Sequence, residues 1–136
     1  MEKAIFSLKG YKFTKVVLNL EDLSDKLEIQ FNPSGKYNEN SGEFFLDFDF
    51  NAISKKNMNL IANIQCKAVF QFAKSQKIDT IPDFFYPNTI AILFPYIRAY
   101  ISTVTLQANI RPLVLPTMNL SSLKDVLKNN TTLISR

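Results

Sequence analysis

The chain has no histidine, no tryptophan, one cysteine and only three glycines among its 136 residues. Without histidine, Ser-His-Asp and Cys-His nucleophile systems and histidine-ligated metal sites are excluded. A lone Cys66 cannot form an internal disulfide framework. Gly10, Gly35 and Gly42 lie too far apart to build a phosphate-cradling loop, which argues against a nucleotide cycle. We therefore expect a protein that is not an enzyme and that uses no metal or cofactor.

The sequence also lacks long runs of like charge and long apolar runs. The sequence has no run of five like charges, no secretion signal and no apolar run that approaches the ~20 residues of a membrane span. The net charge of +4 arises after residue 68, and it indicates either a preference for acidic partners or simply a solvated basic surface. We expect a single cytoplasmic domain over residues 1–136, with no nucleic-acid binding and no membrane insertion.

Alternating apolar and polar residues predict four strands. The first extends from Ala4 to Leu20 with a bulge or bend at Gly10, and Leu27 to Phe31 form a half-buried second strand. An aromatic face marks Phe44 to Phe50, and the longest alternation extends from Leu60 to Phe72. The short intervening turns favour an antiparallel meander.

Two other segments lack a regular period. Residues 32–42, NPSGKYNENSG, concentrate turn-forming residues, and this predicts an exposed, mobile hairpin loop. Residues 74–87 contain three consecutive aromatics, Phe84, Phe85 and Tyr86. Three neighbouring side chains cannot all face one core, so at least one should be exposed or line a groove.

The stretch from Ile92 to Leu120 predicts a long helix followed by a proline-bracketed link. One stripe of the helix is apolar and the opposite stripe is aromatic and polar, which suits a helix packed between a sheet and another subunit. Pro95 allows a start near Phe94, or a start at Asn88 with a kink at the proline. The apolar stripe holds Leu93, Ile97, Ile101 and Val104, and the other holds Tyr96, Tyr100, Thr103 and Gln107.

A second, shorter helix is predicted near the end of the chain. Ser122 and Asp125 have the spacing of a capping box, ahead of an amphipathic turn with Leu123 and Leu127. Residues 129–136 should be a frayed tail. Strands followed by a block of helices predict an α+β fold: a four-stranded antiparallel sheet, then a long helix and a short C-terminal helix.

The segments LFPYIRAYIS and RPLVLPTMNL resemble the SecB export-chaperone family. That family carries an ILFPYAR-type helix start, then a proline- and leucine-rich link ending in asparagine and an aliphatic residue. The resemblance implies an ATP-independent holdase that binds unfolded or preprotein polypeptides. It also implies a homotetramer built as a dimer of dimers, with long helices at the contact and peptide grooves beside the link.

The resemblance also assigns site residues by position. Aromatic and methionine side chains on irregular backbone suit sequence-tolerant binding of apolar peptides, although they can instead cap the core or an oligomer interface. The expected peptide-binding residues are Phe84, Phe85, Tyr86, Leu113, Leu115, Met118 and Leu120. The expected oligomer-interface residues are Tyr96, Tyr100, Thr103, Leu60, Ala62, Ile64 and Cys66.

The chain departs from the family at the positions expected to dock the SecA motor. Asn63 stands where a glutamate is expected, and Thr14 and Lys15 stand where acidic residues are expected. Docking to SecA is therefore not expected, because the carboxylates that would steer it are missing. Two alternatives stay open: a dedicated chaperone of one partner such as an antitoxin, and a domain that encloses a small apolar ligand.

Overall fold

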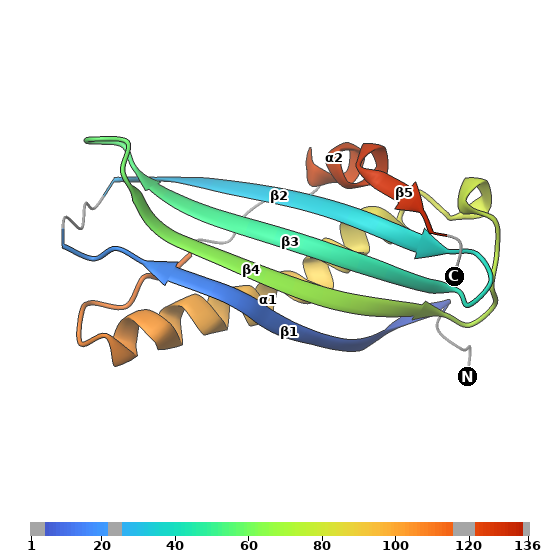
Figure 1. Ribbon diagram of the computed structural model, residues 1–136, viewed down its shortest axis with the longest axis horizontal. Coiled ribbons are helices and arrows are strands. Elements are labelled where there is room, and N and C mark those ends of the chain that lie inside the picture. Colours follow the sequence, from blue (N-terminus) through green and yellow to red (C-terminus); the bar gives the residue numbers. More distant parts are fainter. Residues whose placement is uncertain (1–4, 22–25, 116–121, 135–136) are drawn as a thin grey trace.

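The computed structural model describes residues 5–21, 26–115 and 122–134. One sheet has the strand order β1-β4-β3-β2-β5, and the long helix α1 crosses one of its faces (Figure 1). The α+β class, with a long helix and a short C-terminal helix, is confirmed. The elements are β1 (Phe6–Leu18), β2 (Leu27–Asn38), β3 (Glu43–Ser54), β4 (Leu60–Phe72), the 3-10 turn η1 (Ile78–Thr80), α1 (Phe85–Gln107), α2 (Leu123–Asn129) and β5 (Thr131–Leu133).

The predicted four-stranded antiparallel meander is wrong in two respects. β5 pairs with β2 in parallel, so the sheet is mixed and five-stranded. β1 pairs with β4 rather than with β2, which follows it in the chain. The two strands match because their apolar residues face each other, as in the pairs Phe6↔Phe72 and Leu8↔Phe70. Two register shifts, one of them between Leu8 and Gly10, restore the alternation of β1, and this confirms the predicted bulge.

The predicted loop over residues 32–42 is mostly strand. β2 continues to Asn38, and only residues 39–42 turn the chain into β3. Gly35 is required by close packing, because a Cβ there would clash with the Phe44 ring and lie 2.9 Å from Thr131 Oγ1. Pro33 is tolerated because proline without an N–H occurs at the edges of sheets. Both residues look like loop formers in the sequence, but here both lie within β2, and β5 pairs with that strand at Gly35.

The predicted frayed tail over residues 129–136 is also wrong for its described part. Thr131–Leu133 form β5 on β2. The Gly35 amide donates to the Asn130 carbonyl at 3.2 Å, and the Ile134 amide donates to the Tyr37 carbonyl at 2.9 Å. These bonds fix the end of α2 against the sheet. Residues 135 and 136 lie outside the described residues.

Helix α1 begins at Phe85, earlier than either predicted start. Pro87 falls in the first helical turn, where a missing N–H breaks no intrahelical bond. Pro95 lies inside the helix on its exposed side. Leu93, Ile97 and Ile101 are buried as predicted, whereas Val104 is half-buried.

The length and composition of α1 would also suit a membrane span, which no apolar run in the sequence had indicated. The core helix of a folded domain passes the same test. Nine α1 side chains are buried within the chain. This packing against the sheet gives α1 the role of a core helix.

The core has two parts along α1. Under the first half of the helix lies an aromatic cluster that includes Phe44, Phe48, Phe70 and Phe85. Under the second half lies a smaller cluster of Phe50, Ala52, Ala62, Ile64, Phe94, Ile101 and Leu115. The link after α1 therefore contributes to the core through Leu115.

Candidate peptide-binding surface

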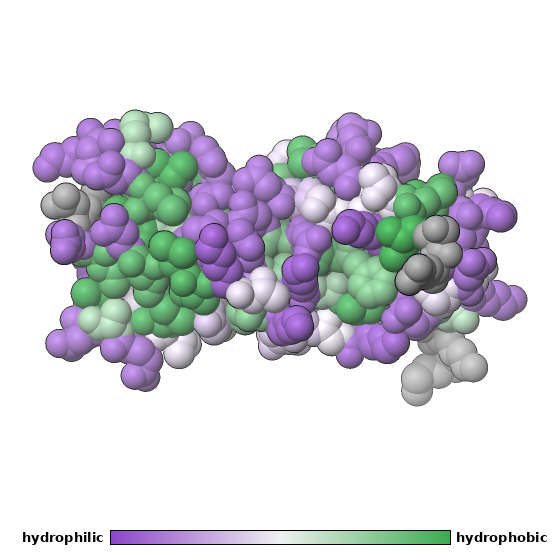
Figure 2. All heavy atoms as spheres, viewed as in Figure 1, coloured by the Kyte–Doolittle hydropathy of each residue, from purple (hydrophilic) through white to green (hydrophobic). Residues whose placement is uncertain are grey.

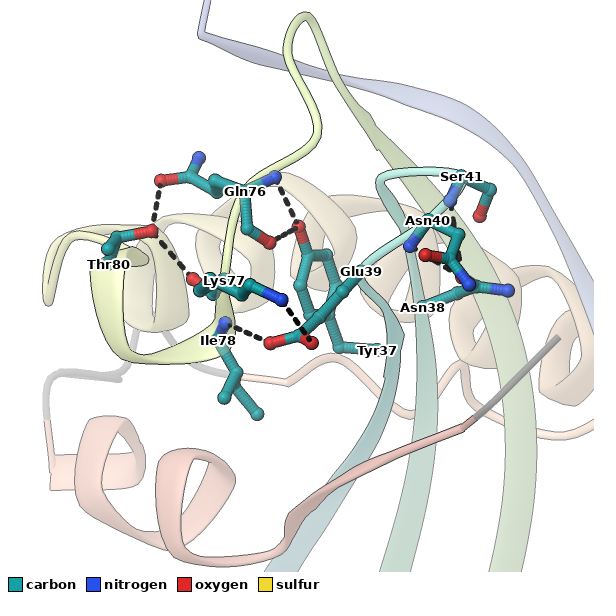
Figure 3. Close-up of polar contacts among 9 residues, drawn as sticks. All are labelled: Tyr37, Asn38, Glu39, Asn40, Ser41, Gln76, Lys77, Ile78 and Thr80. Atoms are coloured by element: carbon teal, nitrogen blue, oxygen red, sulfur yellow. Dashed lines mark hydrogen bonds and ion pairs between the residues drawn. The ribbon is translucent and has the colours of Figure 1, made fainter.

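The segment before α1 is fastened to the end of β2, and Figure 3 shows the contacts. The Tyr37 hydroxyl donates to the Gln76 carbonyl at 2.7 Å and accepts from the Gln76 amide at 3.2 Å. Glu39 Oε2 accepts from the Ile78 amide at 2.8 Å. Thr80 Oγ1 closes the η1 turn on the Lys77 carbonyl at 2.6 Å. These bonds set where the three consecutive aromatics at the start of α1 lie.

Those three aromatics divide between core and surface. Phe84 is 46% exposed, whereas Phe85 and Tyr86 are buried in the aromatic cluster. Burial also raises the pKa of the Tyr86 hydroxyl. The prediction that one of the three would be exposed is confirmed. The assignment of Phe85 and Tyr86 to a peptide-binding surface is corrected, because the sheet and α1 already enclose their rings.

The link after α1 packs along the second half of that helix. The Leu113 amide donates to Thr105 Oγ1 at 2.8 Å, and Ser102 Oγ donates to the Leu113 carbonyl at 3.1 Å. Leu113 is half-buried and Leu115 is buried, both against the smaller core cluster. Met118 and Leu120 lie outside the described residues. The described members of the predicted peptide-binding set therefore do not form one cluster, since Phe84 lies just before α1 and Leu113 follows its end.

A row of half-buried apolar residues follows β2 beside this link. Leu27, Ile29 and Phe31 pack on the same core cluster as Leu113, and Phe31 and Leu123 both pack on the aromatic cluster. Figure 1 shows α2 lying along the outer side of β2. We call these five residues the β2-edge surface. Exposed Val114 and Val126 adjoin it in the chain.

The backbone of β2 completes this surface. β5 pairs with β2 only over Gly35–Tyr37. Among the described residues, no strand pairs with residues 27–34 on the side away from β3. Alternate residues of such an edge present N–H and C=O groups that an added strand can bond. The surface thus combines apolar side chains with a strand edge that no other described strand occupies, which is what an extended peptide needs.

An exposed charge cluster holds α2 in place beside this surface. Lys128 Nζ donates to Asp83 Oδ1 at 2.8 Å, and Lys124 Nζ lies 3.9 Å from Asp83 Oδ2. The hydrogen bond from Lys128 lowers the pKa of the Asp83 carboxyl, and the same bond raises the pKa of Lys128. Because these side chains are exposed, solvent screens the pair.

The predicted oligomer-interface residues also divide between two environments. Tyr96 and Thr103 lie exposed on the outer side of α1, and Tyr100 stacks on Phe13 with ring centroids 3.9 Å apart. The assignment of Ala62, Ile64 and Cys66 is corrected, since these strand residues are buried beneath α1. They cannot touch another subunit directly, because they occupy the face of β4 that α1 covers. Leu60, at the start of β4, is exposed.

The remaining candidates for chemistry are a metal site, the single thiol and the polar residues of the open face. They contain no group of three His, Cys, Asp or Glu residues that could hold a metal ion. Burial raises the pKa of the Cys66 thiol to about 11, so the reactive thiolate is scarce near neutral pH. Asn63 lies on the open face of the sheet but is only 8% exposed. Its Nδ2 donates to Asp49 Oδ1 and to Asn51 Oδ1, both at 2.8 Å.

Sequence reasoning identified Leu27 to Phe31 as a strand but missed its place at the edge of the site. Its half-buried alternation resembles that of any strand on an open sheet. One available signal was Pro33, since proline within a strand favours an edge position.

Three comparisons bear on the identity of the chain. The family model described as preprotein translocase subunit SecB matches residues 12–127. An uncharacterized protein of Methanocaldococcus jannaschii is 30% identical over 119 residues, which cover 82% of this chain and 76% of that protein. A Mycobacterium tuberculosis SecB-like chaperone, solved in complex with a ChAD peptide from the HigA1 antitoxin, has a similar fold. Its TM-score is 0.68 at 13% sequence identity, over 84% of this chain and 88% of that one. The chain belongs to the SecB family.

Proposed function

We propose that this protein is an ATP-independent holdase that keeps polypeptide clients extended on its β2-edge surface. Family membership supports a chaperone rather than an enzyme. The observation that carries the proposal is the stretch of β2 over residues 27–34, whose outer side no described strand pairs, beside half-buried apolar side chains. A folded protein offers few free strands to such an edge, whereas an unfolded client offers many. The surface would therefore select for the unfolded state.

Binding would use two weak kinds of contact at once. A client segment adds as a strand to β2, and its alternate side chains pack on Leu27, Ile29 and Phe31. Such contacts discriminate little between sequences, because the hydrogen bonds involve backbone alone. Several weak contacts along one long client would then add up through multivalency.

We propose further that the protein works as a homotetramer in the cytoplasm, with the outer side of α1 at the contact between dimers. Ile92, Tyr96 and Leu106 are exposed there without any charged neighbour in the same stripe. Tyr96 lies beside Tyr11 of β1, with ring centroids 4.5 Å apart. A second copy packed on this face would remove apolar area from water.

A dedicated chaperone for one partner is the second candidate function. The similar Mycobacterium tuberculosis chaperone was solved with an antitoxin peptide, which makes a single-partner client worth testing here. Docking to SecA remains unexpected, because Asn63 is occupied by its bonds to Asp49 and Asn51 and carries no charge. Preprotein export through that motor is therefore not part of the proposal.

The first test is light scattering on a sizing column, with and without a permanently unfolded protein. A particle with the mass of about four chains, which gains mass with the unfolded protein, is the expected result. A tetramer that ignores the unfolded protein would favour the dedicated chaperone. A monomer that ignores it would contradict the chaperone assignment altogether.

A pair of matched variants locates the client site. Val114→Asp places a charge beside the β2-edge surface, and it should weaken binding of the unfolded protein about tenfold. Met58→Asp is the control, since Met58 is similarly exposed, at 66% against 62% for Val114, but lies in the β3–β4 turn. Equal effects of the two changes would show that the client binds elsewhere.

A further inference from the structure

The open face of the sheet, which α1 does not cover, carries a hollow of about 500 Å³. Its walls come from all four long strands and from Ile134, which follows β5. Figure 2 looks onto this face and shows apolar surface near the β5 end of the sheet among polar side chains. We call this hollow the open-face pocket. Its main side chains are Lys12, Lys36, Phe45, Lys67, Val69 and Ile134.

The hollow exists because one position in its wall has no side chain. Gly10, Val69, Phe45 and Lys36 lie next to one another across β1, β4, β3 and β2. A Cβ at Gly10 would meet no atom within 4 Å. The apolar floor of Val69 and Phe45 is therefore open on the β1 side. A space of this volume accommodates a bulky apolar side chain.

The charges around the pocket are unbalanced. Three lysines line it against one carboxylate, Asp47. Lys12 and Lys67 lie directly opposite each other on β1 and β4, and like charges in that arrangement repel. Asp47 lies 3.8 Å from Lys67, but both side chains are about half exposed, so the pair is weak. Among the described residues, neither Lys12 nor Lys36 forms an ion pair.

We propose that the open-face pocket docks an acidic polypeptide segment that carries one bulky apolar side chain. That side chain fills the space over Phe45 and Val69, and flanking carboxylates of the segment bind Lys12, Lys36 and Lys67. The negative charge relieves the repulsion between Lys12 and Lys67 that the free protein tolerates. The docking site faces away from α1, so a partner bound there leaves the helix-covered side free for a client.

The neighbouring surface favours a short acidic segment over a nucleic acid. An adjoining hollow is lined by Asp47 and Asp49 together with uncharged polar residues and Lys67. A phosphate backbone that crosses the face would meet these carboxylates after leaving the lysines. A peptide with its charges confined to the open-face pocket avoids Asp49 and meets only Asp47, which lies 3.8 Å from Lys67.

The proposal is tested by fluorescence anisotropy with a labelled acidic peptide that carries one central leucine or phenylalanine. The full-length protein should bind this peptide at low salt, and the affinity should fall as salt screens the lysines. Lys12→Glu should weaken binding about tenfold, whereas Lys55→Glu, the same change in the distant β3–β4 turn, should have little effect. The acidic peptide with its apolar residue replaced by serine should bind about tenfold more weakly.

Gly10→Leu supplies an uncharged test of the same site. The new side chain enters open space, so the variant should fold as the wild type does while its pocket is filled. It should weaken binding of the apolar-acidic peptide, but it should barely change that of the serine peptide. An unfolded client should not displace the acidic peptide, since the two occupy different faces.

Three results would overturn the proposal. The first is that the wild-type protein binds neither apolar-acidic peptide. The second is that Lys12→Glu and Gly10→Leu, shown by circular dichroism to be folded, both bind the peptide as tightly as the wild type does. The third is an oligonucleotide that binds more tightly than the peptides and is released by the same substitutions. That last outcome would assign the pocket to nucleic acid instead.

Discussion

The same four long strands present two faces that are built by different rules. On the face that α1 covers, Phe44, Phe48 and Phe70 are fully buried, and the rings of Phe44 and Phe70 pack against that of Phe85 on the helix. On the open face, the alternate residues of the same strands include Asp49, Asn63 and Lys67. Asn63 donates to Asp49 at 2.8 Å, and Lys67 lies 3.8 Å from Asp47. Shape complementarity specifies the first face, and charge and hydrogen bonding specify the second. The following substitutions test that difference, from the largest expected effect to the smallest.

On the covered face, the substitution that lowers stability most should be that of Phe85, whose ring α1 inserts into the aromatic cluster. Phe85 contacts several rings, including those of Phe6, Phe44 and Phe72, with centroids 4.6–4.9 Å apart. Phe85→Ala should lower the free energy of unfolding by about 3–5 kcal/mol, since it leaves a cavity among them. This loss of stability is measured by urea denaturation followed by far-ultraviolet circular dichroism, which does not rely on tryptophan fluorescence.

Phe84→Ala provides the matched control one residue earlier. Its side chain is half exposed, so the same truncation should cost about 1 kcal/mol or less. Equal losses for the two variants would mean that the rings are not divided between core and surface as described.

Alanine substitutions at two glycines compare the two faces by the opposite change, because they add a methyl group instead of removing a ring. At Gly35, beneath Phe44 and Thr131, the methyl group has no room, and Gly35→Ala should destabilise the protein by about 1–3 kcal/mol. At Gly10 the space is open, so Gly10→Ala should be neutral or stabilise the protein by up to about 1 kcal/mol. Thermal melts of both variants decide this, and a stable Gly35→Ala protein would show that β5 does not press on β2.

Neighbouring positions on β4 should differ in thiol chemistry. Burial raises the pKa of Cys66 from 9.0 to about 11, so the folded protein holds the thiol proton more tightly than the unfolded chain does. Stability linked to Cys66 is therefore complete below pH 9 and falls as the pH rises toward 11, by about 1 kcal/mol at pH 10. Cys66→Ala should lack this component when denaturation is compared at pH 8 and pH 10.

Alkylation sharpens the same comparison. Native Cys66 should react with iodoacetamide far more slowly at pH 8 than in denaturant. Lys67→Cys in a Cys66→Ala background moves the thiol by one residue to the exposed open face, and it should react at nearly the denatured rate. Rapid alkylation of native Cys66 would contradict its burial beneath α1.

The sequence predicted those elements whose signals are local. The alternation in Phe44–Phe50 and Leu60–Phe72 marks β3 and β4 because one face of each strand is buried throughout. Leu93, Ile97 and Ile101 likewise marked the buried stripe of α1. In each case a single periodic pattern is enough, since both the strand and the helix expose a repeating face to the core.

The elements that sequence reasoning missed depend on distant partners. Gly35 looks like a loop residue until Thr131 and Phe44 are placed against it. Nothing local distinguishes the three residues of β5 from a tail, because they become a strand only by pairing with β2. The edge of β2 was missed as part of the site for the same reason: which strand lies at an edge follows from the order of the whole sheet. The oligomer assignment of Ile64 and Cys66 failed because α1 covers that face.

The strand order also sets the sequence of events in folding. β2, β3 and β4 are joined by short turns, so they can pair early, when only small loops must close. β1 must wait for β4, and β5 pairs with a strand from which most of the chain separates it. Such non-local pairings slow folding. In pulse-labelled hydrogen exchange, the amides of Gly35 and Ile134, which bond across the β2–β5 contact, should therefore gain protection last, and a nascent or refolding chain would expose the β2 edge along its full length until they do.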